Sequence, residues 1–365
     1  MSGAAMVAQG KRLTRAVVCQ GGGMTALQSC PVPDPGEGEL LLRLRLAGLC
    51  GTDLVKLSSK SAVPGTVLGH EVVGSVEAVG PGVEGFALGK RVVAASHVAC
   101  GVCALCRAGN ETMCEAFKEN LMYPGGFSDL VLISRRAVEE AAFVVPDAVS
   151  DEQAVFLEPA ACVLRGIDRS GLERRGTVAV LGCGAMGLLH LLVLRAAVPS
   201  AKVVMVDPDV ERLEMAKRLG ADGVGVPGPG VEIVVQELAG GLGADVVFDT
   251  VGGASALEEG LGLSRAGGTV VLFSHSPEHA AAGFDLNSLF THERRIIGTN
   301  HGARKEQVRV FELICDGALD PAPLVTHRYG LEDFGMGAAF AKRQKALKVV
   351  YTPSQGADSG ENIYD

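Results

Sequence analysis

The stretch that decides the fold is VAVLGCGAMG, from Val178 to Gly187. It has the pattern of a buried strand that runs into a G-x-G-x-x-G turn and then into an apolar helix from Leu188 to Ala197. An acidic residue, Asp207, ends the next apolar run. A glycine-rich turn alone matches many sequences by chance, whereas this combination is typical of a dinucleotide-binding unit.

The three glycines of this turn have separate predicted roles. Gly182 makes the tight turn, Gly184 lets a pyrophosphate approach the backbone, and Gly187 lets the helix pack against the strand. Ala185 and Met186 lie between them and complete the predicted cofactor-binding segment.

Asp207 is predicted to select the cofactor. A carboxylate at the end of this strand accepts hydrogen bonds from both hydroxyls of the adenosine ribose, whereas a 2′-phosphate would face its negative charge. The sequence therefore predicts NAD rather than NADP. A helix-capping role is the alternative for Asp207. Arg212, five residues further on, either flanks the adenine or ribose or is an arginine of the helix surface.

Strands and helices alternate between residues 177 and 300. This rhythm predicts an α/β fold with a doubly wound, parallel, six-stranded sheet. One of the intervening helices is predicted from Val210 to Leu219, closed by Gly220. The candidate strands are 177–182, 202–207, 222–226, 244–249, 268–273 and 295–299.

The part of the chain before this unit predicts a β-rich, barrel-like domain. Between Arg15 and about Arg91, short apolar runs alternate with Gly/Pro clusters. Ser150 and Gln153 then form a capping-box pattern, which predicts one helix leading into the dinucleotide unit. The predicted division is 13–163 for the β-rich domain, 164–300 for the nucleotide-binding domain, 301–352 for a return to the first domain and 353–365 for a disordered tail.

The composition limits the classes of function. The 365 residues are 47% hydrophobic and 21% charged, which is enough for two globular domains. A formal charge of −9 argues against nucleic acid or an anionic membrane as the main partner. Because neither a membrane-spanning apolar run nor a signal-peptide pattern is visible, the sequence predicts a cytoplasmic protein.

Four of the ten cysteines lie close together, within residues 96–115. Four thiolates at such spacing form a closed tetrahedral zinc site, which is structural because no position is left for substrate. An iron–sulfur cluster is an alternative, but its typical run ends in a three-residue gap and a proline. Unliganded buried cysteines and a nucleic-acid zinc ribbon are further alternatives, although the loop is poor in apolar and basic residues. The four are Cys100, Cys103, Cys106 and Cys114.

A second set of potential metal ligands is distributed over three segments. Cys50 begins the run Cys50-Gly51-Thr52-Asp53, and His70 and Glu71 follow later. A thiolate, an imidazole and a carboxylate with one open position define a catalytic zinc site. Glu158, flanked by apolar residues on the predicted helix, is a further candidate because burying an unpaired carboxylate is costly. A surface or salt-bridged glutamate is the alternative for Glu158.

These motifs occur in one order over roughly residues 15–352. They are Cys50-Gly51-Thr52-Asp53, Gly69-His70-Glu71, the four-cysteine lobe, Gly125-Gly126-Phe127-Ser128, Glu158-Pro159 and Gly182-x-Gly184-x-x-Gly187 with Asp207. In this order the chain resembles zinc-dependent medium-chain dehydrogenases of the sorbitol (polyol) and threonine dehydrogenase type. The resemblance implies a GroES-like fold for the β-rich domain and a Rossmann fold for the nucleotide-binding domain.

The same resemblance implies the ligands of a catalytic zinc. Cys50 and His70 would bind it, while Glu71, Glu158 and water would share the remaining positions. With the structural site, the chain would hold two Zn²⁺ ions.

A proton relay is also implied by the resemblance. Thr52 matches the hydroxyl residue that takes up the substrate proton. Many relatives carry the outer relay histidine where this chain has Val55, followed by Lys56. Without this histidine, the proton either leaves through the cofactor ribose and water or passes to another group that replaces the histidine. Lys56 is a candidate for such a group.

The leading hypothesis for the function is a zinc- and NAD-dependent dehydrogenase of a secondary alcohol, which is a polyol, sugar or amino alcohol. A threonine-type or primary-alcohol dehydrogenase is the alternative among enzymes. A catalytically inactive NAD(P)H-binding regulatory protein is the alternative of another class. The resemblance suggests a homodimer or homotetramer joined through the nucleotide-binding domains. The substrate pocket is expected near Leu54, Leu121, Tyr123, Phe127 and Asn300.

Overall fold

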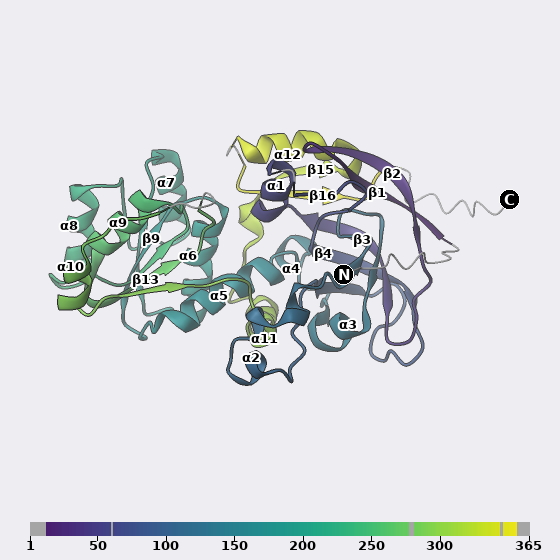
Figure 1. The fold of residues 1–365 in the computed structure, drawn as a ribbon, viewed down its shortest axis with the longest axis horizontal. Coiled ribbons are helices and arrows are strands. Elements are labelled where there is room, and N and C mark those ends of the chain that lie inside the picture. Colours follow the sequence, from purple (N-terminus) through teal and green to yellow (C-terminus); the bar gives the residue numbers. More distant parts are fainter. Residues whose placement is uncertain (1–11, 60, 277–280, 344–345, 356–365) are drawn as a thin grey trace. The chain divides into compact units, whose positions relative to one another are not determined.

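The computed structural model describes residues 12–59, 61–276, 281–343 and 346–355 (Figure 1). The chain forms two compact units. The first unit comprises Met1–Glu158 and Val325–Asp365, and the second unit comprises Pro159–Leu324. The chain therefore passes from one unit to the other twice, at residues 158–159 and 324–325.

The second unit contains the predicted parallel sheet of six strands, in the order β11-β10-β9-β12-β13-β14. All five residues of β9 are buried, as expected for a central strand covered on both faces. The Rossmann-type prediction is confirmed, with strand ends that differ by a few residues. The strands are β9 (Thr177–Leu181), β10 (Lys202–Val206), β11 (Gly223–Gly225), β12 (Ala244–Asp249), β13 (Ser264–Leu272) and β14 (Arg295–Gly298).

Helices connect these strands (Figure 1). The predicted helix that ends before Gly220 is present as α7, and Gly220 has a φ of 97°, which a residue with a side chain rarely adopts. The helices of this part of the chain are α5 (Leu157–Ser170), α6 (Ala185–Ala197), α7 (Val210–Arg218), α8 (Pro229–Leu238), α9 (Ala254–Leu263), α10 (Leu286–Thr291) and α11 (Arg304–Cys315), followed by the 3₁₀ helix η3 (Ala322–Leu324).

The first unit is β-rich, as the alternating apolar runs predicted. A curled eight-stranded sheet runs in the order β15-β16-β3-β4-β5-β8, with β7 on β3 and β6 on β7, and β1 and β2 form a separate hairpin. Its strands are β1 (Arg12–Gly21), β2 (Met24–Val32), β3 (Leu40–Gly48), β4 (Glu71–Val79), β5 (Arg91–Ala95), β6 (Met122–Tyr123), β7 (Leu130–Ile133), β8 (Ala142–Val144), β15 (Val325–Gly330) and β16 (Lys348–Thr352).

Short helices complete the first unit. They are α1 (Gly51–Ser58), α2 (Ala104–Arg107), α3 (Arg135–Ala141), α4 (Asp151–Ala154) and α12 (Phe334–Lys342), with the 3₁₀ helices η1 (Glu111–Met113), η2 (Glu115–Lys118) and η4 (Leu331–Asp333).

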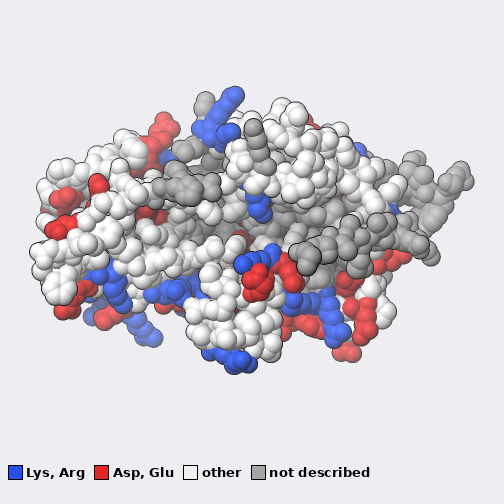
Figure 2. All heavy atoms as spheres, in the orientation of Figure 1, with Lys and Arg blue, Asp and Glu red and all other residues white. Residues whose placement is uncertain are grey.

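The face of the protein shown in Figure 2 carries acidic and basic side chains interspersed with uncharged ones.

The single helix predicted from Ser150 is wrong in its extent, because the structure has two helices there. The capping box of Ser150 and Gln153 is present, and it starts α4. That helix ends at Ala154, and α5 begins at Leu157. Pro159 supplies the reason, since it has no N–H to continue the hydrogen-bond ladder of α4 and is tolerated in the first turn of a new helix.

The predicted domain limits differ from the two units at α11. The sequence-based division placed this helix in the β-rich domain, whereas it lies in the second unit. A buried ion pair between Arg165 of α5 and Glu306 of α11, 3.6 Å apart, holds the two helices together. Gly302 allows this contact, because a Cβ at that position would lie 2.5 Å from the carbonyl carbon of Ala161.

The first residues of the predicted C-terminal tail, 353–355, have a defined position in the first unit. Ser354 is buried, and its backbone N–H donates to Oδ1 of Asp129 at 2.8 Å. The side chains of the same two residues are also hydrogen-bonded. The remainder of the predicted tail, residues 356–365, and the N-terminal residues 1–11 lie outside the described part of the chain.

His190 of α6 is a histidine in the core of the second unit. Its ring packs edge-on against Phe273, with centroids 4.4 Å apart, and lies 4.9 Å from the ring of Phe248. Its Nδ1 is hydrogen-bonded to the carbonyl oxygen of Met186 at 2.7 Å, while Nε2 has no hydrogen-bond partner among the described residues. Burial lowers the pKa of His190 to about 4, so the folded protein holds this ring neutral at neutral pH.

We expect acid to destabilise the protein partly through His190. The unfolded chain binds a proton there near pH 6.5, whereas the folded chain resists until about pH 4. Stability that is fully present above pH 6.5 is therefore lost between these values, by up to about 3 kcal/mol. Denaturant titrations at pH 7 and pH 4 should show a loss about 3 kcal/mol smaller in His190→Leu than in the native chain. Equal losses in the two proteins would contradict this.

Candidate active site

Strand pairing brings the first potential metal ligands together in the first unit. Cys50 stands at the N-terminus of α1, just after β3, and His70 and Glu71 stand where β4 begins. Because β3 and β4 pair antiparallel with Gly48 opposite Glu71, the end of one strand meets the start of the other. Ligand atoms of Cys50, His70 and Glu71 all lie within 4.8 Å of one another.

Gly48 makes this close approach possible. A Cβ at this position would lie 1.9 Å from Oε2 of Glu71 and 2.9 Å from Cε of Lys348. Any side chain there would push Glu71 out of the cluster, so the glycine is part of the site geometry.

Asp53 orients the imidazole of His70. Its carboxylate is fully buried, and it accepts hydrogen bonds from the backbone N–H groups of Cys50 at 3.2 Å and Gly69 at 3.4 Å. One carboxylate oxygen lies 3.6 Å from Nδ1 of His70. A carboxylate in this position fixes the ring and leaves the second ring nitrogen for a metal. From the sequence alone, Asp53 was recognisable only as the last residue of the motif Cys50-Gly51-Thr52-Asp53.

The charges around His70 favour a cation. Burial acts to lower the pKa of His70, but Asp53, Cys50 and Glu158 raise it, and the net pKa lies well above its usual value. A thiol, an imidazole and a buried carboxylate in mutual reach, surrounded by further negative charge, fit the donor set of a zinc ion. In addition, Oε1 of Glu71 is buried and accepts no hydrogen bond from the described residues.

Lys348 is a residue of the site that was not predicted from the sequence. It is buried at the start of β16, and its Nζ forms an ion pair with Oε2 of Glu71. The same ammonium lies 5.6 Å from the ring centroid of Phe156. Burial acts to lower the pKa of Lys348, but Glu71 and Cys50 raise it above its usual value. A lysine within an apolar strand pattern, Lys348-Val349-Val350-Tyr351, was the sequence feature that could have revealed it.

The other predicted residues are placed as follows. Oγ1 of Thr52 donates to Sγ of Cys50 at 3.2 Å, which puts the predicted relay hydroxyl at the site. Val55 and Lys56 are exposed on α1. Glu158, the second residue of α5, acts electrostatically on His70 but does not belong to the group of ligand atoms formed by Cys50, His70 and Glu71.

The expectation for the substrate pocket is partly wrong. Phe127 is a core residue, fully buried, with its ring centroid 4.9 Å from Phe334 and 5.4 Å from Tyr351. A different residue, His97, lies beside the candidate zinc ligands, with its ring centroid 6.3 Å from that of His70. His97 lies two residues after the end of β5 and three residues before Cys100, and its position as a polar residue just beyond an apolar strand was the available clue.

The four clustered cysteines converge in the first unit, on a lobe built from α2, η1 and η2. Their sulfur atoms lie within 4.8 Å of one another, with the Cys103–Cys106 pair at 3.5 Å and the Cys100–Cys114 pair at 3.6 Å. Hydrogen bonds led by the backbone N–H of Cys100 lower the pKa of Cys114 to about 6, whereas burial and the neighbouring thiols raise the pKa of Cys106 to about 12. Four sulfurs at these distances fit a structural zinc ion.

The glycine turn in the second unit has the geometry of a dinucleotide site. It lies at the carboxyl end of β9, beside β12, where the strand order of the sheet reverses. Gly182 has a φ of 93°, and a Cβ on Gly187 would lie 1.8 Å from the carbonyl oxygen of Gly182. By contrast, a Cβ on Gly184 would meet nothing within 4 Å, so the backbone is open to a ligand there. Ala185 and Met186 form the first turn of α6.

Asp207 follows β10 and is tied to this turn. Its Oδ2 accepts a hydrogen bond from the backbone N–H of Cys183 at 2.6 Å, and its Oδ1 accepts one from Asp209 at 2.8 Å. Nη1 of Arg212 lies 3.9 Å from Oδ2 of Asp207. The helix cap of α7 is Asp209, whose side chain accepts from Glu211 and Arg212, so the capping alternative for Asp207 is wrong.

In the part of the chain that the structure describes, none of the helices combines the length and the apolar character needed to cross a membrane.

Two family models match the chain. Residues 36–144 match the alcohol dehydrogenase GroES-like domain, and residues 185–315 match the zinc-binding dehydrogenase domain.

Curated relatives match nearly the whole chain. Sorbitol dehydrogenase of Halalkalibacterium halodurans is 29% identical over 340 residues, which cover 91% of this chain and 97% of the relative. L-Threonine 3-dehydrogenase of Aeromonas hydrophila is 30% identical over 330 residues, which cover 88% of this chain and 93% of the relative.

Solved structures match with similar coverage. One is described as a zinc-binding dehydrogenase of Sinorhizobium meliloti 1021 bound to NADP. It has a TM-score of 0.84 and 28% sequence identity, and the match covers 94% of this chain and 100% of that one.

Proposed function

The chain belongs to the zinc-binding alcohol dehydrogenase family, and from this premise we propose that it oxidises the CH–OH group of a polyol, sugar or amino alcohol with NAD. The observation that carries the proposal is the cluster of Cys50, His70 and Glu71, with ligand atoms within 4.8 Å of one another. An inactive binding protein would have no need to keep these three groups together with the orienting Asp53. The names of the relatives, sorbitol and threonine dehydrogenases, support an alcohol with further polar groups.

The residues of the site have distinct roles in this reaction. Zinc would act as a Lewis acid that lowers the pKa of a bound alcohol, and nicotinamide would accept the hydride. Cys50, His70 and either Glu71 or Glu158 would hold the zinc. Thr52, hydrogen-bonded to Sγ of Cys50, would accept the proton of the alcohol and pass it toward solvent.

Turnover with a panel of alcohols tests this proposal. Polyols, sugars, threonine and simple alcohols are each offered with NAD, and the absorbance of NADH is followed. We expect turnover with at least one class and, by metal analysis, two zinc ions per chain. NADH binding without turnover of any class, at full zinc content, would favour the regulatory alternative.

The proposal of NAD as cofactor rests on Asp207. The solved relative from Sinorhizobium meliloti is bound to NADP, so family membership alone does not decide the question. The carboxylate of Asp207 lies at the end of β10 beside the glycine turn, where it would meet the adenosine ribose. A 2′-phosphate there would be repelled. Arg212 would flank the ribose or adenine from the same side.

Asp207→Ser is therefore expected to raise the KM for NAD by about 10- to 100-fold, since hydrogen bonds to a charged group contribute about 1.5–3 kcal/mol. The KM for NADP should change little or fall, because the repulsive charge is gone. Asp209→Ser is the matched control, since it removes a carboxylate from the same loop that caps α7. An equal rise in KM for both cofactors in Asp207→Ser would count against a ribose contact.

We further propose that two copies associate through the edge of the parallel sheet. β14 is an edge strand with one side unpaired, and the nearby α10 exposes Leu286 by 72% and Phe290 by 80%. Replacing both apolar residues with Asp should convert the oligomer to a monomer in sedimentation velocity. Leu13→Asp, an equally exposed position in the first unit, is the control. An unchanged sedimentation coefficient would exclude this edge as the interface.

We place the protein in the cytosol as part of the same proposal. Four of the ten cysteines converge as potential zinc ligands rather than as disulfide partners. Thiolate ligands persist in a reducing compartment.

A further inference from the structure

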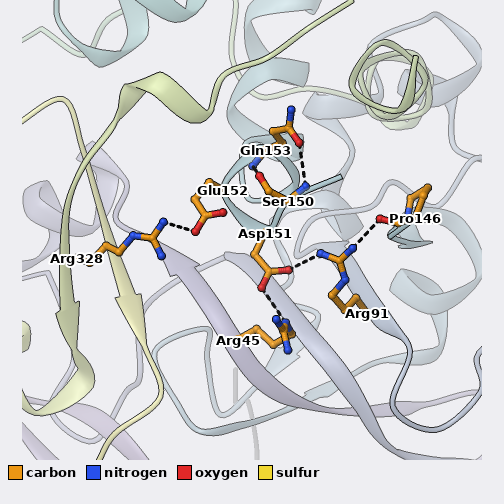
Figure 3. A network of polar contacts seen from close by, with 8 residues as sticks. All are labelled: Arg45, Arg91, Pro146, Ser150, Asp151, Glu152, Gln153 and Arg328. Atoms are coloured by element: carbon orange, nitrogen blue, oxygen red, sulfur yellow. Dashed lines mark hydrogen bonds and ion pairs between the residues drawn. The ribbon is translucent and has the colours of Figure 1, made fainter. Parts of the chain in front are cut away.

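A network of ion pairs surrounds α4, the short helix that precedes Glu158 (Figure 3). Asp151, its first residue, accepts from Nε of Arg45 at 2.8 Å and from Nη1 of Arg91 at 3.0 Å. Arg91 also donates to the carbonyl oxygen of Pro146 at 2.6 Å. The next residue, Glu152, is paired with Arg328. The first two residues of α4, Asp151 and Glu152, thus tie this short helix to three strands, β3, β5 and β15.

The strands that supply the two arginines of Asp151 flank the strand of the candidate zinc ligands. Arg45 lies on β3 and Arg91 on β5, and β4 runs between them in the sheet. Glu71 begins β4 and His70 precedes it. Arg91 lies opposite Ser75 in the sheet, so Asp151 bridges across β4 four residues beyond Glu71 and links α4 to the strand that delivers these two groups.

One arm of this bridge is shielded from solvent. The side chains of Asp151 and Arg91 are exposed by only 15% and 18%, whereas that of Arg45 is exposed by 45%. Exposed pairs contribute little because water screens them and their side chains are free to move. The positional restraint on Asp151 therefore comes mainly from its contact with Arg91, which Arg45 extends to β3.

The position of α4 also restricts the position of Glu158, because few residues separate the two. The capping box of α4 is closed, with Ser150 and Gln153 exchanging hydrogen bonds of 2.8 and 3.1 Å. Only Val155 and Phe156 separate α4 from α5, and both are buried. Glu158 is the second residue of α5, so its backbone position follows from that of α4.

We propose that Asp151, held by Arg45 and Arg91, is a positioning residue that sets the distance between Glu158 and the metal held by Cys50 and His70. This inference rests on the proposed function, because it takes Glu158 as a zinc ligand. Residues that orient metal ligands usually change metal affinity about 10- to 100-fold when removed, and we expect this range for Asp151.

The test measures the metal site itself in the full-length protein. Zinc is replaced with cobalt, and the absorption spectrum of each cobalt-loaded protein is recorded. Subtracting the spectrum of cobalt-loaded Cys50→Ser then leaves only the absorption of the site that contains Cys50. Asp151→Ala and Glu158→Gln should both weaken cobalt binding at this site by at least about 10-fold and shift its ligand-field bands in the same direction. If Asp151→Ala does not fold, Asp151→Asn replaces it under the same criteria.

Glu77→Ala is the matched control. Glu77 of β4 accepts from Nε and Nη2 of Arg43 on β3, both at 3.0 Å, and its ion pairs within the described residues are with Arg43 and Arg12 rather than with the arginines that hold α4. It should lower stability without changing the cobalt spectrum or affinity. An unchanged site in Glu158→Gln would refute the role of Glu158 as a ligand. A changed site in Glu158→Gln but not in Asp151→Ala, or an equal change in Glu77→Ala, would overturn the positioning role alone.

Discussion

Cys50→Ser is expected to reduce kcat by about 10³-fold or more while leaving NADH binding intact. Lewis-acid stabilisation by zinc contributes several kcal/mol to the transition state, and each 1.36 kcal/mol corresponds to a factor of ten in rate. The sulfur of Cys50 lies within 4.8 Å of the ligand atoms of His70 and Glu71, so its loss removes the one thiolate of this group.

The measurement combines metal analysis with cofactor binding. Zinc content should fall from two ions per chain to one, and the dissociation constant of NADH, read by fluorescence, should stay within about twofold. Cys19→Ser is the control, since Cys19 is a buried cysteine on β1 outside the ligand group. Retained turnover in Cys50→Ser would refute the catalytic zinc role, whereas lost NADH binding would indicate general misfolding.

Lys348→Met is expected to destabilise the first unit by about 3–5 kcal/mol, because removing one partner of a buried ion pair leaves the other charge uncompensated. Glu71 is 2% exposed and Lys348 is 5% exposed, so water cannot replace the lost ammonium. The comparison is made in a Cys50→Ser background, where a catalytic zinc does not compete for the carboxylate of Glu71. Free energies of unfolding are measured by denaturant titration.

The double change Lys348→Met with Glu71→Gln separates charge from packing. It removes the unpaired charge while keeping the volume of both side chains, so most of the lost stability should return. If the double variant is as unstable as Lys348→Met alone, the lysine stabilises the unit through packing against Phe156 and the ion pair is not the cause.

Local sequence patterns predicted the parts of the fold that depend on neighbouring residues. The six parallel strands, the glycine turn and the convergence of the four cysteines follow from periodicity and short spacing. In these cases the residues that decide the structure lie close together along the chain. The pairing of Cys50 with His70 was predicted on other grounds, from the zinc-binding chemistry of the two side chains and from the resemblance to a family, because the two residues stand on different elements.

The features that the sequence did not predict depend on contacts between distant segments. Lys348 and Glu71 lie in the two separate segments of the chain that form the first unit, and the meeting of β16 and β4 on either side of β3 has no local signature. The core position of Phe127 depends on Phe334 and Tyr351 in the same way. The placement of α11 follows from Arg165 and Glu306, a pairing that becomes visible only in three dimensions.

The break between α4 and α5 changes the electrical environment of Glu158. In a continuous helix this carboxylate would stand beside satisfied peptide groups, with no net field from them. In the structure it is the second residue of α5, where the first backbone N–H groups lack carbonyl partners and the peptide dipoles add to a partial positive charge. A carboxylate is stabilised at such a helix end. Pro159, in the first turn of the new helix, therefore leaves Glu158 at a position that favours its side chain over an uncharged one.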